Sequence, residues 1–286
     1  MGSNTILKAV YRDWFRMGVA CEMINGRFTN HELGNPDKEA LMKKHFNSMT
    51  FGNELKPETN IGFRSPEATE EYLPFVINPQ AKKMLDWAKE NGMPVRGHVM
   101  VWHSQCPKEV FCKGYEPVTI PTDPELLKER PMLKFFEKLD PVCFVDRETM
   151  LKRLKSYIFS LVEYMYAADY ARTVYAWDVV NEAMEENEED GWRKKSPWYQ
   201  TVGEDFVAYA FRFARKYAGP GVKLFYNDYN TNYILHRGSP FFFTVFLRLF
   251  ISRIGMGLPL WFGQATLDDN SQHFCVYGVC AHLFHQ

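Results

Sequence analysis

Short apolar runs alternate with amphipathic segments along most of this chain. Five of the runs have the length of strands buried on both faces, and the segments between them carry apolar residues every three or four positions. We predict strands over residues 16–21, 48–52, 94–102, 174–180 and 223–226. The alternation of strand and helix from residue 16 to residue 232 indicates an α/β fold with a parallel sheet and crossover helices.

The helices between these strands have recognisable ends. Asn35 and Asn78 each precede a proline, which puts a capping residue before a helix with Pro at its first position. Gly92 and Gly219 end two of the periodic segments, and Asp146 begins the longest one. The sequence therefore predicts helices that start after residues 35, 78 and 146.

The repeated units favour a (β/α)₈ TIM barrel over a dinucleotide-binding sheet, because no G-x-G-x-x-G turn accompanies them. Strands one to five are recognisable, so we predict an incomplete barrel with an atypical C-terminal third. In such a barrel the catalytic side chains lie at the C-terminal ends of the strands. Functional residues are therefore expected just after residues 52, 102, 180 and 226.

Two segments interrupt the pattern. Residues 106–146 are rich in Pro and charge, and they predict an elaborated connection with one short helix after Asp123. An acidic run follows the fourth strand and consists of Glu185, Glu186, Glu188, Glu189 and Asp190. The run lacks the Asp/Asn-Gly geometry of a calcium loop, so we predict a solvated surface loop, with calcium binding as the alternative.

Residues 233–286 do not continue the pattern. They contain no Lys and no Glu, but they hold four of the eight His and eight of the 23 Phe. The apolar run at residues 240–251, interrupted by Thr244 and Arg248, is too short for a membrane span of roughly 20 residues. We interpret this tail as a shifted reading frame or foreign sequence, and a membrane-associating element is the alternative.

The composition is that of an ordinary globular protein. The chain is 46% hydrophobic and 24% charged, and its net charge of −1 gives no electrostatic reason to expect a nucleic acid or an anionic membrane as partner. Aromatic residues make up 16% of the chain. That share suits a large core and also suits sugar binding, so composition alone leaves both open.

The N-terminal residues and the cysteines predict a cytoplasmic location. Lys8, Arg12, Asp13 and Arg16 interrupt the only apolar stretch of residues 1–22, so this stretch has no signal-peptide core. The six cysteines show no C-x-x-C pair and no metal-ligand spacing, which favours reduced thiols. A leader removed before the first residue would instead indicate a secreted protein.

Polar groups, acids and aromatic residues converge on one rim of the predicted barrel. In chain order the motifs at the strand ends are Asn53-Glu54-Leu55-Lys56, then Arg96-Gly97-His98 with Trp102-His103-Ser104-Gln105, then Trp177-Asp178-Val179-Val180-Asn181-Glu182, and finally Tyr226-Asn227-Asp228-Tyr229. A single motif of this kind would not identify a function, but four on one rim indicate a site.

Asn181 and Glu182 form the polar pair that follows the fourth strand, where a barrel carries its catalytic side chains. A carboxyl group there can donate or accept a proton, and the amide beside it can form hydrogen bonds. Lys56 offers hydrogen-bond donors, and Trp102 offers a face for packing. The alternative for Asn181 and Glu182 is a helix N-terminus with capping chemistry.

His98 and His103 raise the question of a metal. Five positions apart on a regular strand, they point to opposite faces, and no third His or Cys completes a site. We therefore expect no metal, and we expect these His to bond to sugar or to a carboxylate. Trp87, Trp192 and Trp198 have no motif around them and are interpreted as packing residues.

In order and spacing the motifs resemble glycoside hydrolase family 10, the retaining endo-1,4-β-xylanases. The resemblance covers about residues 5–232 and rests on the combination of Arg-Gly-His and Trp-His-Ser-Gln with Trp-Asp-Val-Val-Asn-Glu-Ala. It implies that residues 1–232 are the N-terminal part of a catalytic domain that acts on xylan or xylo-oligosaccharides, as a monomer and without a cofactor.

The resemblance also implies roles for individual residues. Glu182 would be the acid/base, and Asn181 would bind the 2-hydroxyl of the sugar. The subsites before the cleaved bond would be lined by Asn53, Lys56, His98, Trp102 and Gln105, and the site would be bordered from the fifth strand by Asn227 and Tyr229.

The nucleophile of a retaining enzyme is not identifiable in this sequence. It would be a second carboxylate about 5 Å from the first, and the family carries it in an Ile-Thr-Glu-Leu-Asp motif that is absent here. No Glu follows Glu204, and Asp268 and Asp269 stand in a poor substitute for the motif. A Gln-Ser-His motif and late tryptophans are also missing, and Gly52 stands where many relatives have Glu. We therefore expect negligible hydrolysis of xylan by this chain.

Two other classes of function stay open. One is a catalytically inactive remnant that binds xylan or xylo-oligosaccharides through Asn53, Lys56 and Trp102. The other is a different retaining β-glycanase on the same barrel, such as a cellulase-like enzyme, because several such families share an Asn-Glu pair after strand four.

Overall fold

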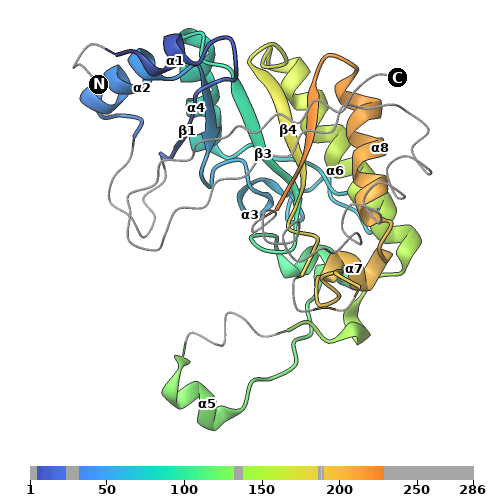
Figure 1. The fold of residues 1–286 in the computed structure, drawn as a ribbon. Helices are drawn as coiled ribbons and strands as arrows, with labels where there is room; N and C mark the ends of the chain where they lie inside the picture. The colour runs from blue at the N-terminus through green and yellow to red at the C-terminus, as the bar shows by residue number, and fades with distance from the viewer. Residues whose placement is uncertain (1–4, 24–31, 132–137, 186–187, 189, 229–286) are drawn as a thin grey trace.

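The computed structural model describes residues 5–23, 32–131, 138–185, 188 and 190–228. In this part of the chain five parallel strands form one sheet, and their order in the sheet is their order in the sequence (Figure 1). The strands are β1 (Gly18–Cys21), β2 (Ser48–Phe51), β3 (Val95–Trp102), β4 (Val174–Asn181) and β5 (Lys223–Asn227). Each begins and ends within two residues of its predicted bounds. The predicted tail at residues 233–286 lies outside the described residues.

The strands read as apolar runs because both faces of the central ones are covered. All residues of β2 are buried, and so are most of those in β3 and β4. Parallel strands lying between helices and an interior have this pattern, and the strict alternation of a half-exposed strand is absent from them. Burial along the strands therefore does not distinguish one face from the other.

Two irregularities change the pairing near the C-terminal ends of the strands. After His98, β3 carries one extra residue relative to β4, and after Asp178, β4 carries one extra residue relative to β5. Bulges of this kind bend a strand, re-aim its side chains and are common next to active sites. Here they bring Trp102, Asn181 and Asn227 to matching positions on three neighbouring strands.

Four long helices lie in the described part of the chain, and the first three begin where their caps predict. They are α2 (Pro36–His45), α4 (Pro79–Glu90), α6 (Arg147–Ala167) and α8 (Phe206–Ala218). The side chains of Asn35, Asn78 and Asp146 each accept hydrogen bonds from backbone N–H groups of the first turn, which otherwise have no partner inside a helix. The helix α8 ends just before Gly219, whose φ is 73°.

Shorter helical segments connect these elements. They are the α-helices α1 (Leu7–Val10), α3 (Pro57–Asn60), α5 (Pro124–Glu129) and α7 (Pro197–Val202), and the 3₁₀ turns η1 (Lys108–Phe111), η2 (Lys113–Tyr115) and η4 (Pro141–Cys143). The predicted short helix after Asp123 is α5, which lies well away from the sheet in Figure 1.

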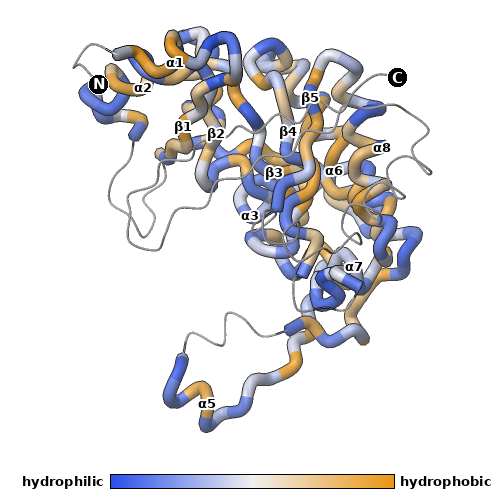
Figure 2. The backbone as a smooth tube through the Cα atoms, in the orientation of Figure 1, coloured by the Kyte–Doolittle hydropathy of each residue, from blue (hydrophilic) through white to orange (hydrophobic). Residues whose placement is uncertain are grey.

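The helices α6 and α8 pack against each other, and α8 also packs on β4 and β5 (Figure 1). Hydrophobic and hydrophilic residues alternate along both helices in Figure 2, as their predicted periodicity requires. The side that α8 buries includes Ala210, Phe211 and Ala214. The small side chains of Ala210 and Ala214 allow the helix to approach the sheet closely. Burial of a side chain the size of Phe211 stabilises the fold by about 1.5–3 kcal/mol.

The connection between β3 and α6 is anchored at both ends. Arg153 of α6 is fully buried and donates to the carbonyl oxygens of Val110 and Cys112 at 2.8 and 2.9 Å. At the other end Cys143 approaches Cys112, with 2.9 Å between the two Sγ atoms. The four described cysteines are free thiols in this structure. The segment between Cys112 and Cys143, which contains α5, therefore begins and ends at neighbouring positions.

The acidic run after β4 is only partly described. Its Glu185 pairs with Arg193, and its Asp190 pairs with Lys194 at 2.8 Å. In the described part of the chain no three His, Cys, Asp or Glu side chains are arranged to hold a metal ion. The helices of that part also include none that is long and apolar enough to cross a membrane.

Candidate active site

Three predicted residues meet at the C-terminal ends of β2 and β3. Lys56 Nζ donates to Asn53 Oδ1 at 2.9 Å and to Gln105 Oε1 at 2.6 Å, and Gln105 Nε2 donates to Asn53 Oδ1 at 3.0 Å. We call Asn53, Lys56 and Gln105 the amide–lysine cluster. The backbone N–H of Glu58 donates to the Gln105 carbonyl at 2.7 Å, which ties the loop after β3 to the first turn of α3.

Lys56 is the cation of this cluster. Burial lowers the pKa of Lys56, and nearby carboxylates oppose that decrease, Glu22 most strongly, followed by Glu58 and Glu182. The Lys56 Nζ also lies 5.1 Å from the ring centroid of Trp102, which is a cation–π distance. Lys56 therefore lies between the cluster and the region of Glu182.

The side chain of Trp102 bonds to Glu182, the candidate acid. Its Nε1 donates to Glu182 Oε2 at 2.9 Å. The position of Trp102 is fixed in turn from α7, because Trp198 Nε1 donates to the Trp102 carbonyl at 3.1 Å. The interpretation of Trp198 as a packing residue agrees with its burial. No local pattern around Trp198 indicated this additional bond to the backbone of the site.

The backbone around Glu182 is not helical. Asn181 is the last residue of β4, and Glu182 has a left-handed φ of 53°. The Glu182 N–H donates to the Asn227 carbonyl at 2.8 Å, and Arg193 Nε donates to the Glu182 carbonyl at 3.0 Å. The alternative of a helix N-terminus at Asn181 and Glu182 is therefore wrong. Non-glycine residues with such φ values cost energy and are concentrated at functional sites.

Asn181 and Asn227 form the border toward β5. Asn227 Nδ2 donates to Asn181 Oδ1 at 2.6 Å, and both residues end their strands in the same register. This bond fixes the orientation of the Asn181 amide next to Glu182. The other predicted border residue, Tyr229, lies outside the described residues.

His98 belongs to a buried charge network. His98 Nδ1 lies 3.0 Å from Asp178 Oδ2, and Arg96 Nε donates to Asp178 Oδ1 at 2.8 Å. Burial raises the pKa of Asp178, but Arg96 and His98 outweigh burial and hold this pKa below its ordinary value. Asp178 is 1% exposed. The prediction that His98 bonds to a carboxylate matches this arrangement.

His103 lies beyond the end of β3, so the regular-strand geometry used for it in the sequence does not apply. Burial lowers the pKa of His103 to about 4, and the charge of Arg193 adds to the decrease. Within the described residues its Nδ1 is buried without a hydrogen-bond partner. His103 is therefore a neutral side chain at neutral pH.

Two carboxylates near the site were not singled out by the sequence. Glu54 is fully buried, and its oxygens accept from the backbone N–H groups of Met23 and Asn53, which makes it a structural residue. Glu22 follows β1, and its Oε1 accepts from Asn53 Nδ2 at 2.6 Å. No local motif marks Glu22, because its contact with Asn53 crosses from one strand end to the next.

The structure thus brings most of the predicted residues together. The amide–lysine cluster, Trp102 and Glu182 are joined by direct contacts, and Asn181 and Asn227 continue the rim along β4 and β5. His98 lies near Trp102, with 6.1 Å between the ring centroids. The polar rim runs along the C-terminal ends of four adjacent strands.

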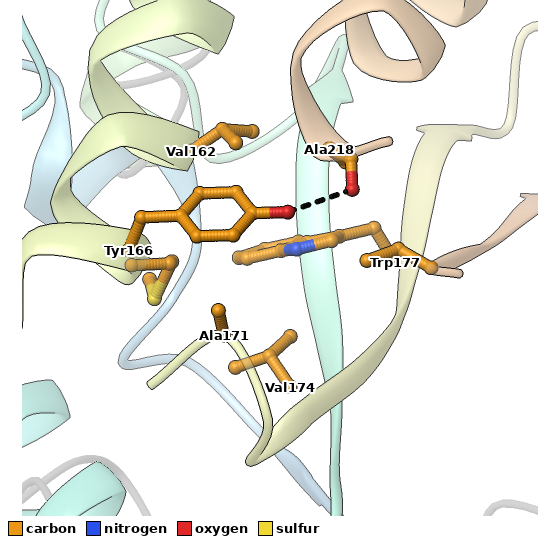
Figure 3. A pocket seen from close by; sticks show the side chains of 8 residues that line it. Val162, Tyr166, Ala171, Val174, Trp177 and Ala218 are labelled. Atoms are coloured by element: carbon orange, nitrogen blue, oxygen red, sulfur yellow. Dashed lines mark hydrogen bonds between the residues drawn. The ribbon is translucent and has the colours of Figure 1, made fainter. Parts of the chain in front are cut away.

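An apolar pocket lies elsewhere, between α6, α8 and the face of β4 that these helices cover (Figure 3). Its lining residues are Val162, Met165, Tyr166, Ala171, Val174, Trp177, Ala218 and Val222. The Tyr166 hydroxyl donates to the Ala218 carbonyl at 3.1 Å beside the Trp177 ring. A pocket with this lining offers packing and no acid–base chemistry, so we do not assign it to the site.

Comparison with known proteins identifies the family of this chain and agrees with its fold. The family model described as Glycosyl hydrolase family 10 matches residues 6–245. Endo-1,4-β-xylanase B of Butyrivibrio fibrisolvens is 38% identical over 229 residues, which are 79% of this chain and 30% of that protein. Endo-1,4-β-xylanase A of Thermotoga maritima is 38% identical over 226 residues, which are 79% of this chain and 17% of that protein.

Solved structures that resemble this chain are also xylanases. An N-terminal endo-1,4-β-D-xylanase of Clostridium thermocellum, in complex with xylohexaose, has a TM-score of 0.68 and 28% identity over 88% of this chain and 44% of its own. An intracellular xylanase of Thermoanaerobacterium saccharolyticum, a mutant with xylotriose, has a TM-score of 0.63 and 26% identity over 91% of this chain and 67% of its own. This chain spans less than a third of the two curated relatives.

A parallel β/α frame with a polar rim at its strand ends defines the class of (β/α)₈ barrel proteins. The chain belongs to glycosyl hydrolase family 10. The predicted (β/α)₈ fold class is confirmed, and the described residues supply five of its strands.

Proposed function

We propose that this chain carries the acid/base and sugar-binding residues of a retaining endo-1,4-β-xylanase, which bind β-1,4-xylan along the ends of β2, β3 and β4, with Glu182 as acid/base. The observation that carries the proposal is the bond from Trp102 Nε1 to Glu182 Oε2, next to Lys56 and its cluster. A sugar chain that bonds to the amide–lysine cluster would lie beside the Glu182 carboxyl. The site therefore combines sugar recognition with a proton donor.

The proposed chemistry follows from the positions of these groups. Glu182 would protonate the leaving oxygen of the glycosidic bond while a carboxylate nucleophile, which this sequence does not identify, forms the bond to the sugar carbon. Glu182 would later take a proton from the water that displaces this carboxylate. The bond from Trp102 Nε1 fixes the orientation of the Glu182 carboxyl group. Lys56, Asn53 and Gln105 offer donors and acceptors to the hydroxyls of the sugar.

The relatives support the substrate class. The family members named above are xylanases, and two of their solved structures contain xylohexaose and xylotriose. A linear sugar of several xylose units fits a rim that continues from β2 to β5. This makes xylan the first substrate to test.

A second candidate function is binding of xylo-oligosaccharides without turnover. The observation that favours it lies in the sequence, where no Glu follows Glu204 and the expected nucleophile motif is absent. Protonation by Glu182 alone does not complete a retaining reaction, which also needs a carboxylate nucleophile. The sugar-binding residues are the same for both candidates, so turnover distinguishes them.

The test compares the full 286-residue chain with its Glu182→Gln variant. Hydrolysis of xylan, cellulose and an aryl xylobioside is measured, and binding of xylotetraose is followed by calorimetry. For an enzyme we expect Glu182→Gln to lower xylan hydrolysis by about 10²–10⁴-fold. The loss should be smaller for the aryl xylobioside, whose good leaving group needs little proton assistance. Glu71→Gln, an exposed carboxylate paired with Lys152, is the matched control.

Each result has a distinct meaning. Xylan turnover that the control keeps and Glu182→Gln loses supports the enzyme, and binding without turnover supports the second candidate. A clear preference for cellulose would indicate another β-glycanase. Absence of both binding and turnover in a folded chain would refute both candidates.

A further inference from the structure

Glu22 extends from the end of β1 to the amide–lysine cluster. Its Oε1 accepts from Asn53 Nδ2 at 2.6 Å, while Asn53 Oδ1 accepts from Lys56 and Gln105. Both ends of the Asn53 amide are therefore held, one by a carboxylate and the other by two donors. The carboxylate lies on the same rim as the cluster, one strand further from Glu182.

The chain leaves space for Glu22 at one specific residue, Gly52. A Cβ atom at position 52 would lie 2.6 Å from the Cγ of Glu22 and closer still to its Oε1. Gly52 does not have a left-handed φ, so its backbone conformation is open to other residues. The glycine is therefore required by the side chain of Glu22 and not by a turn.

Glu22 differs from its neighbour Glu54 in what its oxygens do. The oxygens of Glu54 accept from backbone N–H groups in a fully buried position. Glu22 is partly exposed and accepts from a side chain of the proposed sugar site. Its negative charge also acts on Lys56 more strongly than that of any other carboxylate nearby. Glu22 is therefore part of the polar rim, whereas Glu54 is part of the core.

We propose that Glu22 is a sugar-binding residue, whose carboxylate accepts hydrogen bonds from the hydroxyls of a xylo-oligosaccharide held by Asn53, Lys56 and Gln105. This inference rests on the proposed function. A carboxylate offers about four acceptor positions, and sugar hydroxyls are donors that match them. Glu22 extends the binding site to the end of β1, and Gly52 on β2 makes room for it.

The proposal predicts a loss of affinity when the carboxylate is removed. Xylotetraose is titrated into the full 286-residue chain and into Glu22→Ala and Glu22→Gln variants, with binding measured by calorimetry. A hydrogen bond to a charged group corresponds to about a 10- to 100-fold change in Kd. We expect a loss of this size for Glu22→Ala and a smaller one for Glu22→Gln, which keeps an acceptor oxygen. Glu71→Gln should bind like the parent chain.

A relocated carboxylate separates binding from folding. Gly52→Glu alone should weaken binding, because its side chain would compete with Glu22 for one space. The double variant, Glu22→Ala with Gly52→Glu, should regain at least half of the lost binding free energy, since the vacated space accepts the new carboxylate. Such non-additivity is expected only for residues that share one location. The thermal melting of each variant without sugar reports whether it is folded.

The outcomes are distinguishable from those of the proposed function. No binding of xylotetraose by the parent chain would overturn the proposed function and this inference with it. Binding by the parent chain that Glu22→Ala leaves within about twofold would overturn this inference alone. If Glu22→Ala unfolds, the folded Glu22→Gln variant decides, and unchanged affinity in it would contradict the role of the charge. Rescue by the double variant supports the role.

Discussion

Trp177 and Asp178 are neighbours in β4, but they lie on opposite faces of the sheet. Trp177 is 2% exposed, packs on Gly97 and lines the apolar pocket beside α6 and α8 (Figure 3). Asp178 is 1% exposed, and its carboxylate contacts Arg96 and His98. One face of the strand is stabilised by apolar packing and the other by paired charges.

The difference shows that equal burial does not imply equal chemistry. An apolar side chain is stabilised by leaving water, whereas a buried charge is tolerated only when a partner compensates for its lost hydration. The Trp177 ring needs space against β3, and Gly97 leaves that space because it has no side chain. Asp178 needs opposite charge, and Arg96 provides it. Substitutions on the two faces should therefore fail for different reasons.

The largest effect is expected on the charged face, for Asp178→Ala. The Arg96 guanidinium would remain buried without its carboxylate, and breaking a buried pair in this way costs about 3–5 kcal/mol. Urea denaturation followed by circular dichroism measures the free energy of unfolding. Asp13→Ala removes an exposed carboxylate that pairs with Arg12, and it should leave that free energy nearly unchanged. A loss below about 1 kcal/mol for Asp178→Ala would contradict the role of this pair.

Acid should have the next largest effect, through His103 after the end of β3 and then through Asp178 on the charged face. The pKa of His103 falls from 6.5 to about 4 on burial, so between these pH values the unfolded chain binds more protons than the folded one. Stability should therefore fall as the pH decreases from 6.5 to 4, by about 1.4 kcal/mol per pKa unit and about 3 kcal/mol in all. The lowered pKa of Asp178 acts in the same direction at lower pH, because its stabilising charge is lost as the pH falls through the folded value.

Urea denaturation at a series of pH values measures this dependence. His103→Gln should flatten the slope between pH 6.5 and 4, since glutamine does not titrate there. An unchanged slope in His103→Gln would show that His103 is not the group that titrates.

The smallest effect is expected on the apolar face, for Gly97→Ala. A Cβ at this position would lie 2.6 Å from Cδ2 of the Trp177 ring, so the ring must move toward the pocket. Overpacking of this kind costs about 1–3 kcal/mol. Gly221 has no atom within 4 Å of its added Cβ, so Gly221→Ala is the control and should be neutral or slightly stabilising. Equal unfolding free energies for both variants would mean that the pocket absorbs the ring without cost.

Much of the frame follows from local signals in the sequence. Asn35, Asn78 and Asp146 cap helices by bonding to N–H groups two or three residues away, so each cap acts within a few residues of itself. The site residues after β2, β3 and β4 were also predictable as a group, because the carboxyl ends of parallel strands meet at one edge. The roles of individual residues on that rim remain predictions that substitution must test.

The sequence by itself determined the order of strands and helices, the caps and the edge where polar residues gather, since these depend on neighbours in the chain. Tertiary structure alone decided that Asp178 meets Arg96 and that Glu22 fills the space above Gly52. It also decided the left-handed backbone of Glu182, which is held by bonds from β5 and the loop after β4. These contacts join residues that are far apart in sequence, and bulges in β3 and β4 set their register. A linear pattern carries no information on such distances, so only the folded chain fixes them.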